Sequence, residues 1–162
     1  MLILGIDPGT AITGFGLVDY LGNRFSMVEC GCIRTQAGLP LAERLQTIHR
    51  ELLNNIKQYN PAHVAVEELF FNNNARTALA VGHARGVILL TAAESGLPVF
   101  EYTPLQVKQA VVGFGRAAKA QVEYMVKKIL CIPAVPGPDD VADALAVAIC
   151  HANLYDWERK FK

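Results

Sequence analysis

The chain has 162 residues, of which 52% are hydrophobic and 19% are charged, a composition that supports a full core and argues against disorder. This length fits a single domain over residues 1–162. No apolar run approaches the roughly 20 residues that cross a bilayer. The first residues lack the basic segment of a signal peptide, so we expect a cytoplasmic protein. The four cysteines lack the spacing of a zinc site, and we expect them to be reduced and mostly buried.

The formal net charge is zero, with fifteen basic and fifteen acidic residues. Proteins that bind nucleic acid usually carry a basic patch, so this balance at first argues against DNA binding. Residues 104–130, however, contain five basic side chains and one acidic side chain. If four carboxylates bound cations, eleven acids would remain against fifteen bases, and the surface that meets DNA would be basic.

The first third of the chain has the pattern of three strands. Residues 2–7 form a short, nearly continuous apolar run, which is typical of a buried central strand. Residues 14–20 and 25–34 predict two more strands, joined through the turn at 21–23. We therefore expect an antiparallel meander at the start of the fold.

The rest of the chain alternates between helical and strand patterns. Apolar residues recur with helical period over 39–59, and Pro61 is expected to close that helix. Further strands are expected over 63–67 and 99–102, and further helices over 75–95, 104–112, 119–130 and 139–153. We expect the charged tail from about 156 to 162 to fray. The order of these elements predicts an α/β fold with a mixed five-stranded sheet and helices on both faces.

Acidic residues end both of the strands that have a buried pattern. Asp7 ends the first strand, and Glu67 ends the strand over 63–67. If these strands are parallel neighbours, both carboxylates emerge at one sheet edge, where open α/β sheets place their sites. Asp140 and Asp143 are three residues apart at the start of the last helix and share one face. If that helix begins over the same edge, four carboxylates meet there.

Four carboxylates in one place repel each other unless cations neutralise them, and hard divalent cations prefer oxygen ligands. Two magnesium ions can hold the attacking water and the leaving oxygen of a phosphodiester. Taken singly, each acid has a simpler interpretation. Asp7 can be a turn residue, Asp139 or Asp140 can cap a helix, and Glu67 with Glu68 can be a solvated strand end. Their combination indicates a magnesium-dependent nuclease.

Five segments, in order along nearly the whole chain, resemble the RuvC family of Holliday-junction resolvases. They are Gly-Ile-Asp-Pro-Gly-Thr at 5–10, Ala-Val-Glu-Glu-Leu-Phe at 65–70, Ala-Arg-Gly at 84–86, Gln-Val-Lys-Gln-Ala-Val-Val-Gly at 106–113 and Asp-Val-Ala-Asp-Ala-Leu-Ala at 140–146. This resemblance implies a ribonuclease-H-like fold, a homodimer, and paired nicking of four-way DNA junctions in recombination and repair. It also implies the RuvA–RuvB branch-migration complex as a partner.

The resemblance implies catalytic and metal-binding roles for Asp7, Glu67, Asp140 and Asp143. Two Mg²⁺ ions per subunit are expected, with Mn²⁺ as a substitute and Asp7 bridging the two ions. The family's aspartate pair precedes Ala-Leu-Ala, which selects Asp140, although the adjacent Asp139 could take its place.

The same resemblance implies DNA-binding roles for Phe70, Lys108 and Lys119, and Arg116 in the same basic stretch joins them. An exposed ring at a junction can stack on an unpaired base. The simpler alternatives are that Phe70 and Phe71 both belong to the core and that the lysines are only solvated.

The helix over 75–95 carries small residues at Ala78, Gly82 and Gly86, a spacing that lets a second helix approach closely. Packing against the sheet would explain it equally well. Because the family is dimeric, we assign part of this helix to a dimer interface, and a two-fold dimer suits a nearly two-fold symmetric junction.

Three other functions fit parts of the sequence. An actin-like or sugar-kinase ATPase also opens with a strand and an Asp-x-Gly-Thr type of turn, but it needs a second domain and a second phosphate loop. A YqgF-type nuclease of the same fold would act on RNA. A non-catalytic junction-binding module would not need four carboxylates beside a phosphate groove. His63 and His83 are not assigned as general bases, because a metal can lower the pKa of its bound water without one.

Overall fold

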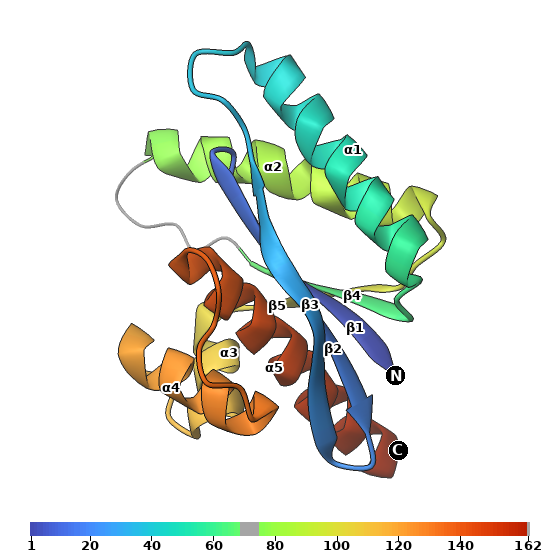
Figure 1. Cartoon of the computed structure of the whole chain (residues 1–162), viewed down its shortest axis with the longest axis vertical. Helices are drawn as coiled ribbons and strands as arrows, with labels where there is room; N and C mark the ends of the chain where they lie inside the picture. Colours follow the sequence, from blue (N-terminus) through green and yellow to red (C-terminus); the bar gives the residue numbers. More distant parts are fainter. Residues whose placement is uncertain (69–74, 162) are drawn as a thin grey trace.

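The computed structural model describes residues 1–68 and 75–161, without the side chains of 156 and 158–161, and contains one five-stranded sheet (Figure 1). The strands are β1 (Leu2–Asp7), β2 (Ile12–Leu21), β3 (Arg24–Arg34), β4 (His63–Glu67) and β5 (Val99–Tyr102). Their order across the sheet is β3-β2-β1-β4-β5. The first three strands are antiparallel, whereas β1, β4 and β5 run parallel. The predicted meander and mixed sheet are both confirmed.

Helices cover both faces of this sheet, as predicted (Figure 1). One face carries α1 (Leu41–Tyr59) and α2 (Ala75–Glu94), and the other carries α3 (Pro104–Val112), α4 (Lys119–Leu130) and α5 (Asp139–Phe161). The expected end of the last helix near residue 153 is wrong. No proline or glycine interrupts residues 139–161, so the helix continues through the charged segment.

Local signals fix the ends of several helices. Thr103 and Gln106 form a capping box at the start of α3, in which each side chain bonds the other residue's backbone N–H. The end of α1 is set by Asn60 in a left-handed conformation rather than by Pro61, because asparagine tolerates positive φ. Ile48, Leu52 and Ile56 form the buried stripe of α1.

Glycines on β1 and β2 allow α5 to lie directly on the sheet. A Cβ atom on Gly5 would lie 2.1 Å from the carbonyl oxygen of Ala144, and one on Gly14 would lie 2.0 Å from that of Asp140. Any side chain at these two strand positions would therefore push the helix away. Gly5 pairs with Gly16 across the two strands, which extends the flat surface under α5.

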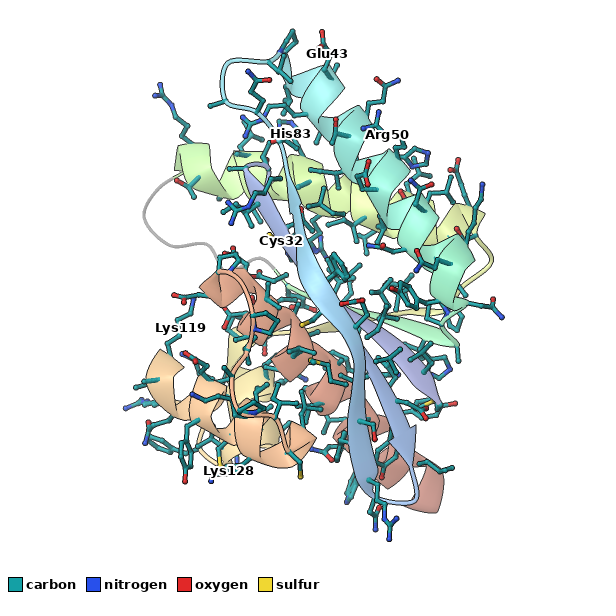
Figure 2. The ribbon with its side chains drawn as sticks, in the orientation of Figure 1. Cys32, Glu43, Arg50, His83, Lys119 and Lys128 are labelled. Atoms are coloured by element: carbon teal, nitrogen blue, oxygen red, sulfur yellow. The ribbon has the colours of Figure 1, made fainter. Side chains whose placement is uncertain are left out.

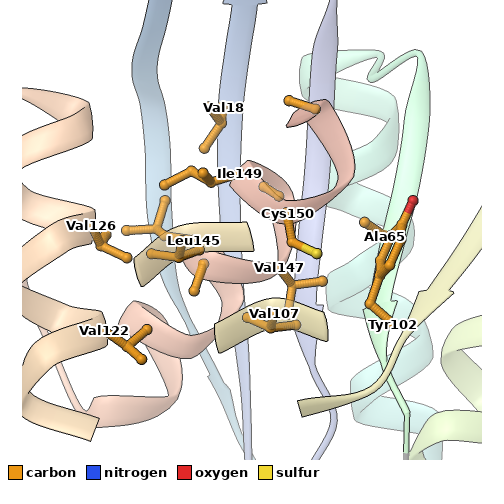
Figure 3. Packing of buried hydrophobic residues seen from close by; sticks show 14 of the residues in the cluster. Val18, Ala65, Tyr102, Val107, Val122, Val126, Leu145, Val147, Ile149 and Cys150 are labelled. Atoms are coloured by element: carbon orange, nitrogen blue, oxygen red, sulfur yellow. The ribbon is translucent and has the colours of Figure 1, made fainter. Parts of the chain in front are cut away.

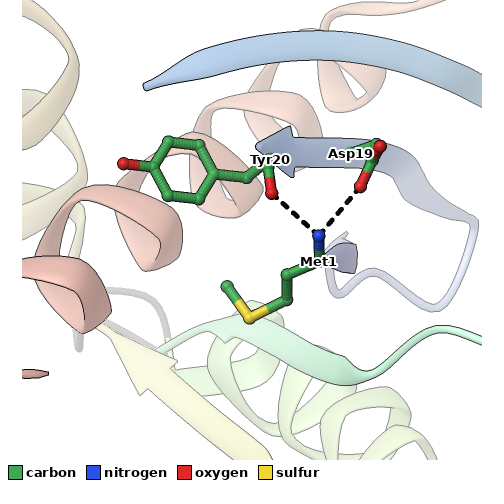
Figure 4. A network of polar contacts seen from close by, with 3 residues as sticks. All are labelled: Met1, Asp19 and Tyr20. Atoms are coloured by element: carbon green, nitrogen blue, oxygen red, sulfur yellow. Dashed lines mark hydrogen bonds and ion pairs between the residues drawn. The ribbon is translucent and has the colours of Figure 1, made fainter. Parts of the chain in front are cut away.

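The core on this face is built around α5, whose residues 144–150 are fully buried (Figure 3). Val122 and Val126 of α4 and Val107 of α3 pack against it. On the opposite face, apolar residues of α1 and α2 pack on Leu4, Ile6 and the neighbouring strands. The α-amino group of Met1 donates hydrogen bonds to Asp19 Oδ1 at 3.0 Å and Tyr20 O at 2.8 Å, which ties the start of β1 to the end of β2 (Figure 4).

All four cysteines are free thiols, as expected. The expectation that most of them are buried is wrong, since only Cys150 is buried. Cys30 and Cys32 are half-buried on one face of β3, an edge strand, and Cys131 is exposed at the end of α4. Within the described residues, no helix combines the length and apolar content of a membrane span.

Replacing Gly5 with alanine tests the close docking of α5. The new methyl group meets backbone atoms, which cannot rotate away, so we expect the free energy of unfolding to fall by about 2 kcal/mol or more. Gly31→Ala is the matched control, because its methyl group would meet only the rim of the Phe15 ring at 3.0 Å. Urea unfolding followed by circular dichroism measures both. Equal stability of the two variants would contradict the docking argument.

Candidate active site

Asp7 and Glu67 end two parallel neighbouring strands. Gly5 of β1 pairs with Ala65 of β4. Asp7 and Glu67 each follow two residues later, so they point to the same face of the sheet as Gly5 and Ala65. This is the face that α5 covers, and the first turns of α5 carry Asp140 and Asp143. The structure thus brings the four sequence-derived carboxylates to one end of the sheet.

Burial and mutual repulsion hold protons on this cluster. Burial raises the pKa of Asp7 to about 8, and the negative charges of Glu67, Asp143 and Asp140 add to the rise. Burial, followed by repulsion from Asp143, also raises the pKa of Glu67 to about 7, which a hydrogen bond with Asp7 partly offsets. The raised pKa values mean that the ionised form of these carboxyl groups is unfavourable in the native state. A bound cation would stabilise the ionised form.

Lys119 is the cation that lies nearest to the cluster. Its ammonium group is 2.9 Å from Asp143 Oδ2 and 3.5 Å from Asp139 Oδ2. Figure 2 labels Lys119 on α4. Although partial burial favours the neutral amine, these contacts with Asp143 and Asp139 raise the pKa of Lys119. Burial likewise raises the pKa of Asp143 while Lys119 opposes that rise. Lys119 therefore stays charged beside the acids.

The structure separates the two neighbouring aspartates at the start of α5. Asp140 is half-buried and contributes to the repulsion on Asp7, whereas Asp139 has a side chain that is 72% exposed and contacts Lys119. The contact between Asp139 and Lys119 could not be predicted from the sequence, because the two residues lie on different helices.

The chemistry of this donor set fits a hard divalent cation. All the candidate ligands are carboxylate oxygens, which magnesium and manganese accept. Among residues 1–68 and 75–161, no three histidine, cysteine or acidic side chains already stand in a metal-holding arrangement.

A pocket of about 250 Å³ opens beside the acids, between α3, α4 and α5. Glu67 and Asp143 line it together with Lys108 and Lys119. The pocket thus joins two of the acids to the two lysines that were expected to bind DNA. Arg116 is exposed in the turn between α3 and α4 and does not line it. Phe70 and its neighbour Phe71 lie outside the described residues.

A second pocket, of about 400 Å³, has Asp140 in its lining. It is lined by the turn after β1, by the beginning of α2, and by Arg44 of α1. No motif or spacing marks Arg44 as a site residue, because it lies on a helix that carries no other feature of the site.

The raised pKa values predict that stability falls with rising pH in the absence of metal. The native state binds more protons than the unfolded chain between the unfolded pKa of a carboxyl, about 4, and the native pKa of Asp7, about 8. From pH 6.5 to 8.5, in chelator, we expect the free energy of unfolding to fall by on the order of 1–2 kcal/mol.

Asp7→Asn should remove most of this slope and raise stability at pH 8, because it removes the most strongly perturbed carboxylate. Thermal unfolding of both proteins over the same pH series measures the difference. A slope that is unchanged in Asp7→Asn would contradict the repulsion described above.

The chain is similar over nearly its whole length to one family of known proteins. The family model "Crossover junction endodeoxyribonuclease RuvC" matches residues 3–151. A protein of that name from Pelotomaculum thermopropionicum is 72% identical over 162 residues, covering 100% of this chain and 99% of the relative. The one from Desulforamulus reducens is 60% identical over 161 residues, covering 99% of this chain and 97% of the relative.

Solved structures give the same result. The structure of Thermus thermophilus RuvC in complex with Holliday junction substrate has a TM-score of 0.92 and 39% identity to this chain, covering 98% of it and 96% of the solved chain. Another structure of Thermus thermophilus RuvC has a TM-score of 0.90 at the same identity. The ribonuclease-H-like fold expected from the sequence is therefore confirmed, and the chain belongs to the RuvC family of crossover junction endodeoxyribonucleases.

Proposed function

We propose that this protein resolves four-way DNA junctions by hydrolysing one phosphodiester bond in each of two opposed strands, in homologous recombination and DNA repair. It is an endonuclease by its family. The observation that carries the proposal is the cluster of buried carboxylates beside a pocket lined by Lys108 and Lys119. The RNA-directed and ATPase alternatives are not favoured, because the resolvase family model spans residues 3–151.

The carboxylates Asp7, Glu67, Asp140 and Asp143 would hold divalent metal, with two Mg²⁺ ions per subunit and Mn²⁺ as a substitute. Bound metal lowers the pKa of a water molecule and neutralises charge on the scissile phosphate. The protein's own contribution is to collect these acids on rigid strand ends and one helix. Their high pKa values in the absence of metal supply a strong preference for a cation.

Lys108 and Lys119 would bind the DNA backbone. Both line the pocket that reaches Glu67 and Asp143, so a phosphate there would have the metal-binding acids on one side and two ammonium groups on the other. We also propose that Arg116 contacts the backbone farther along, since it is exposed in the neighbouring turn. Phe70 is proposed to stack on an unpaired base at the junction centre.

We propose that the protein acts as a homodimer that uses α2. This helix exposes two large apolar side chains, Leu79 at 63% and Leu90 at 56%. Gly86 lies between them, and a Cβ atom built there meets nothing within 4 Å. The three positions lie on one stripe of the helix, which a second copy could cover. Cytoplasmic location and contact with the RuvA–RuvB complex are proposed from family membership alone.

Replacing Asp7 with asparagine should reduce cleavage of a synthetic four-way junction by at least about 10³-fold, because it removes a ligand for the metal that activates water. Binding of the junction should persist, since Lys108 and Lys119 are intact. Gel analysis of a labelled junction and a matched linear duplex, in magnesium and in chelator, measures selectivity and metal dependence together.

Two further variants serve as comparators. Glu51→Gln changes an exposed acid on α1 and should cleave like the unchanged protein. Asp139→Asn should lose less than about 10-fold, because its exposed carboxylate lies outside the buried cluster. Full activity of Asp7→Asn, or equal cutting of duplex and junction, would overturn the proposed function.

Leu90→Glu should weaken the dimer at least about 10-fold, because it places a charge in the apolar stripe of α2. The matched control is Leu21→Glu, which changes a side chain that is 74% exposed on β2. Sedimentation velocity over a concentration series measures the dissociation constant of each. If the unchanged protein is a monomer at tens of micromolar, α2 is not a dimer interface.

A further inference from the structure

Two pockets reach the carboxylate cluster, and the second of these contains an arginine that the proposed function does not use. Glu67 and Asp143 line the first pocket, with Lys108 and Lys119. Asp140 lines the second, with Arg44. A DNA strand whose scissile phosphate rests on the acids must place its neighbouring phosphates on both sides of them. The lysines provide positive charge on one side only.

We propose that Arg44 binds a backbone phosphate of the cleaved strand, on the side of the scissile phosphate opposite Lys108 and Lys119. This rests on the proposed nuclease function and adds a second positioning contact to it. The ligand is a nucleic-acid phosphodiester, held by the guanidinium group in the pocket between the turn after β1 and the start of α2.

Hydrogen bonds fix one edge of the Arg44 guanidinium group. Its Nε–H donates to Thr35 Oγ1 at 2.8 Å, and Thr35 Oγ1 in turn donates to the carbonyl oxygen of Thr10 at 2.6 Å. Thr10 Oγ1 donates to the carbonyl oxygen of Ala80 in α2 at 2.5 Å. This chain ties Arg44 to the turn that follows Asp7 and to α2. The position of the Arg44 side chain is therefore fixed relative to β1, which ends at Asp7.

The other edge of the guanidinium group remains available. Arginine has five N–H donors, of which the bond to Thr35 uses only Nε–H. In the part of the chain that the structure describes, no acidic side chain lies within 4.0 Å of Arg44. The two Nη groups can thus make the paired hydrogen bonds that arginine forms with phosphate oxygens.

The neighbouring arginine on α1 shows the contrast. Arg50 pairs with Glu51 at 3.2 Å, its side chain is 61% exposed, and it lines neither of the two pockets. Figure 2 labels Arg50 on α1. Both residues are cations on the same helix, so α1 offers its own matched control. Of these two arginines, Arg44 has an orientation fixed by a hydrogen bond and lines a pocket together with Asp140, whereas Arg50 does neither.

The test combines protein variants with neutralised DNA phosphates. A series of synthetic four-way junctions is used, and each junction carries one uncharged methylphosphonate. The substituted position is one of the three nearest phosphates on either side of the cleavage site. Single-turnover cleavage in magnesium, with enzyme in excess over the junction, is measured for the unchanged protein, Arg44→Gln, Arg44→Lys and Arg50→Gln. Thermal unfolding of each variant is measured in parallel.

We expect Arg44→Gln to cleave the ordinary junction about 10-fold more slowly or worse, the loss typical of removing a hydrogen bond to a charged group. One methylphosphonate position should slow the unchanged protein similarly and should not slow Arg44→Gln further, because the two changes remove the same contact. Arg44→Lys keeps the positive charge but loses the paired N–H donors of the guanidinium group. Its cleavage rate should therefore lie between those of the unchanged protein and Arg44→Gln. Arg50→Gln should stay within twofold and remain sensitive to that position.

The proposal is overturned if Arg44→Gln cleaves within twofold of the unchanged protein. It is also overturned if every methylphosphonate slows Arg44→Gln by the same factor as the unchanged protein, because a merely structural role lowers the folded fraction without changing that ratio. If the unchanged protein cleaves no junction, the proposed function fails and this contact fails with it. Cleavage by the unchanged protein with no loss in Arg44→Gln rejects the arginine contact alone.

Discussion

The contact between α5 and the glycines of β1 and β2 is the constraint on which the site depends. Gly5 and Gly14 lack a Cβ atom at the points where one would lie about 2 Å from backbone oxygens of α5. The helix can therefore rest directly on the strands, with its first turns over the end of β1. At that separation Asp140 and Asp143 reach the space above Asp7 and Glu67. A larger residue on either strand would lift the helix and open the cluster.

The same contact brings carboxylates together in a half-buried place. Burial and their mutual repulsion raise the pKa values of Asp7 and Glu67. Asp7 and Glu67 hold protons to about pH 8 and about pH 7, respectively. Lys119 contacts Asp143, and its charge also lowers the pKa values of Asp7 and Glu67, but burial of those two carboxyls outweighs it. Under the proposed function, stability and cation binding would be linked, because a divalent cation bound there would relieve the repulsion that folding creates. This also reconciles a net charge of zero with a protein that acts on DNA.

The two pockets that reach the acid cluster are lined by different helices. One extends toward α3 and α4 with two lysines, and the other extends toward α1 and α2 with one arginine. The cations thus come from helices on both faces of the sheet, while the acids come from its end and from α5. A strand of DNA held at both pockets would be fixed on either side of the bond that breaks, which favours one alignment of the scissile phosphate.

Much of the molecule could be predicted from the sequence by itself. Apolar periodicity located the strands and helices, and strand-end acids together with Asp-x-x-Asp at a helix start indicated the residues that we propose to bind metal. These features are local, so the pattern of residues determines them. The end of α5 was missed because a charged segment resembles a tail, although nothing in it breaks a helix.

Only the tertiary structure decided which groups face one another. It placed Asp140 rather than Asp139 beside Asp7, and it joined Asp139 to Lys119. It also brought Arg44 into the lining of a pocket that includes Asp140, from a helix in which neither motif nor spacing marks it. The physical reason is the same in each case. Charge and burial at a site depend on distances between elements, and those distances are set by packing, above all by the glycines beneath α5.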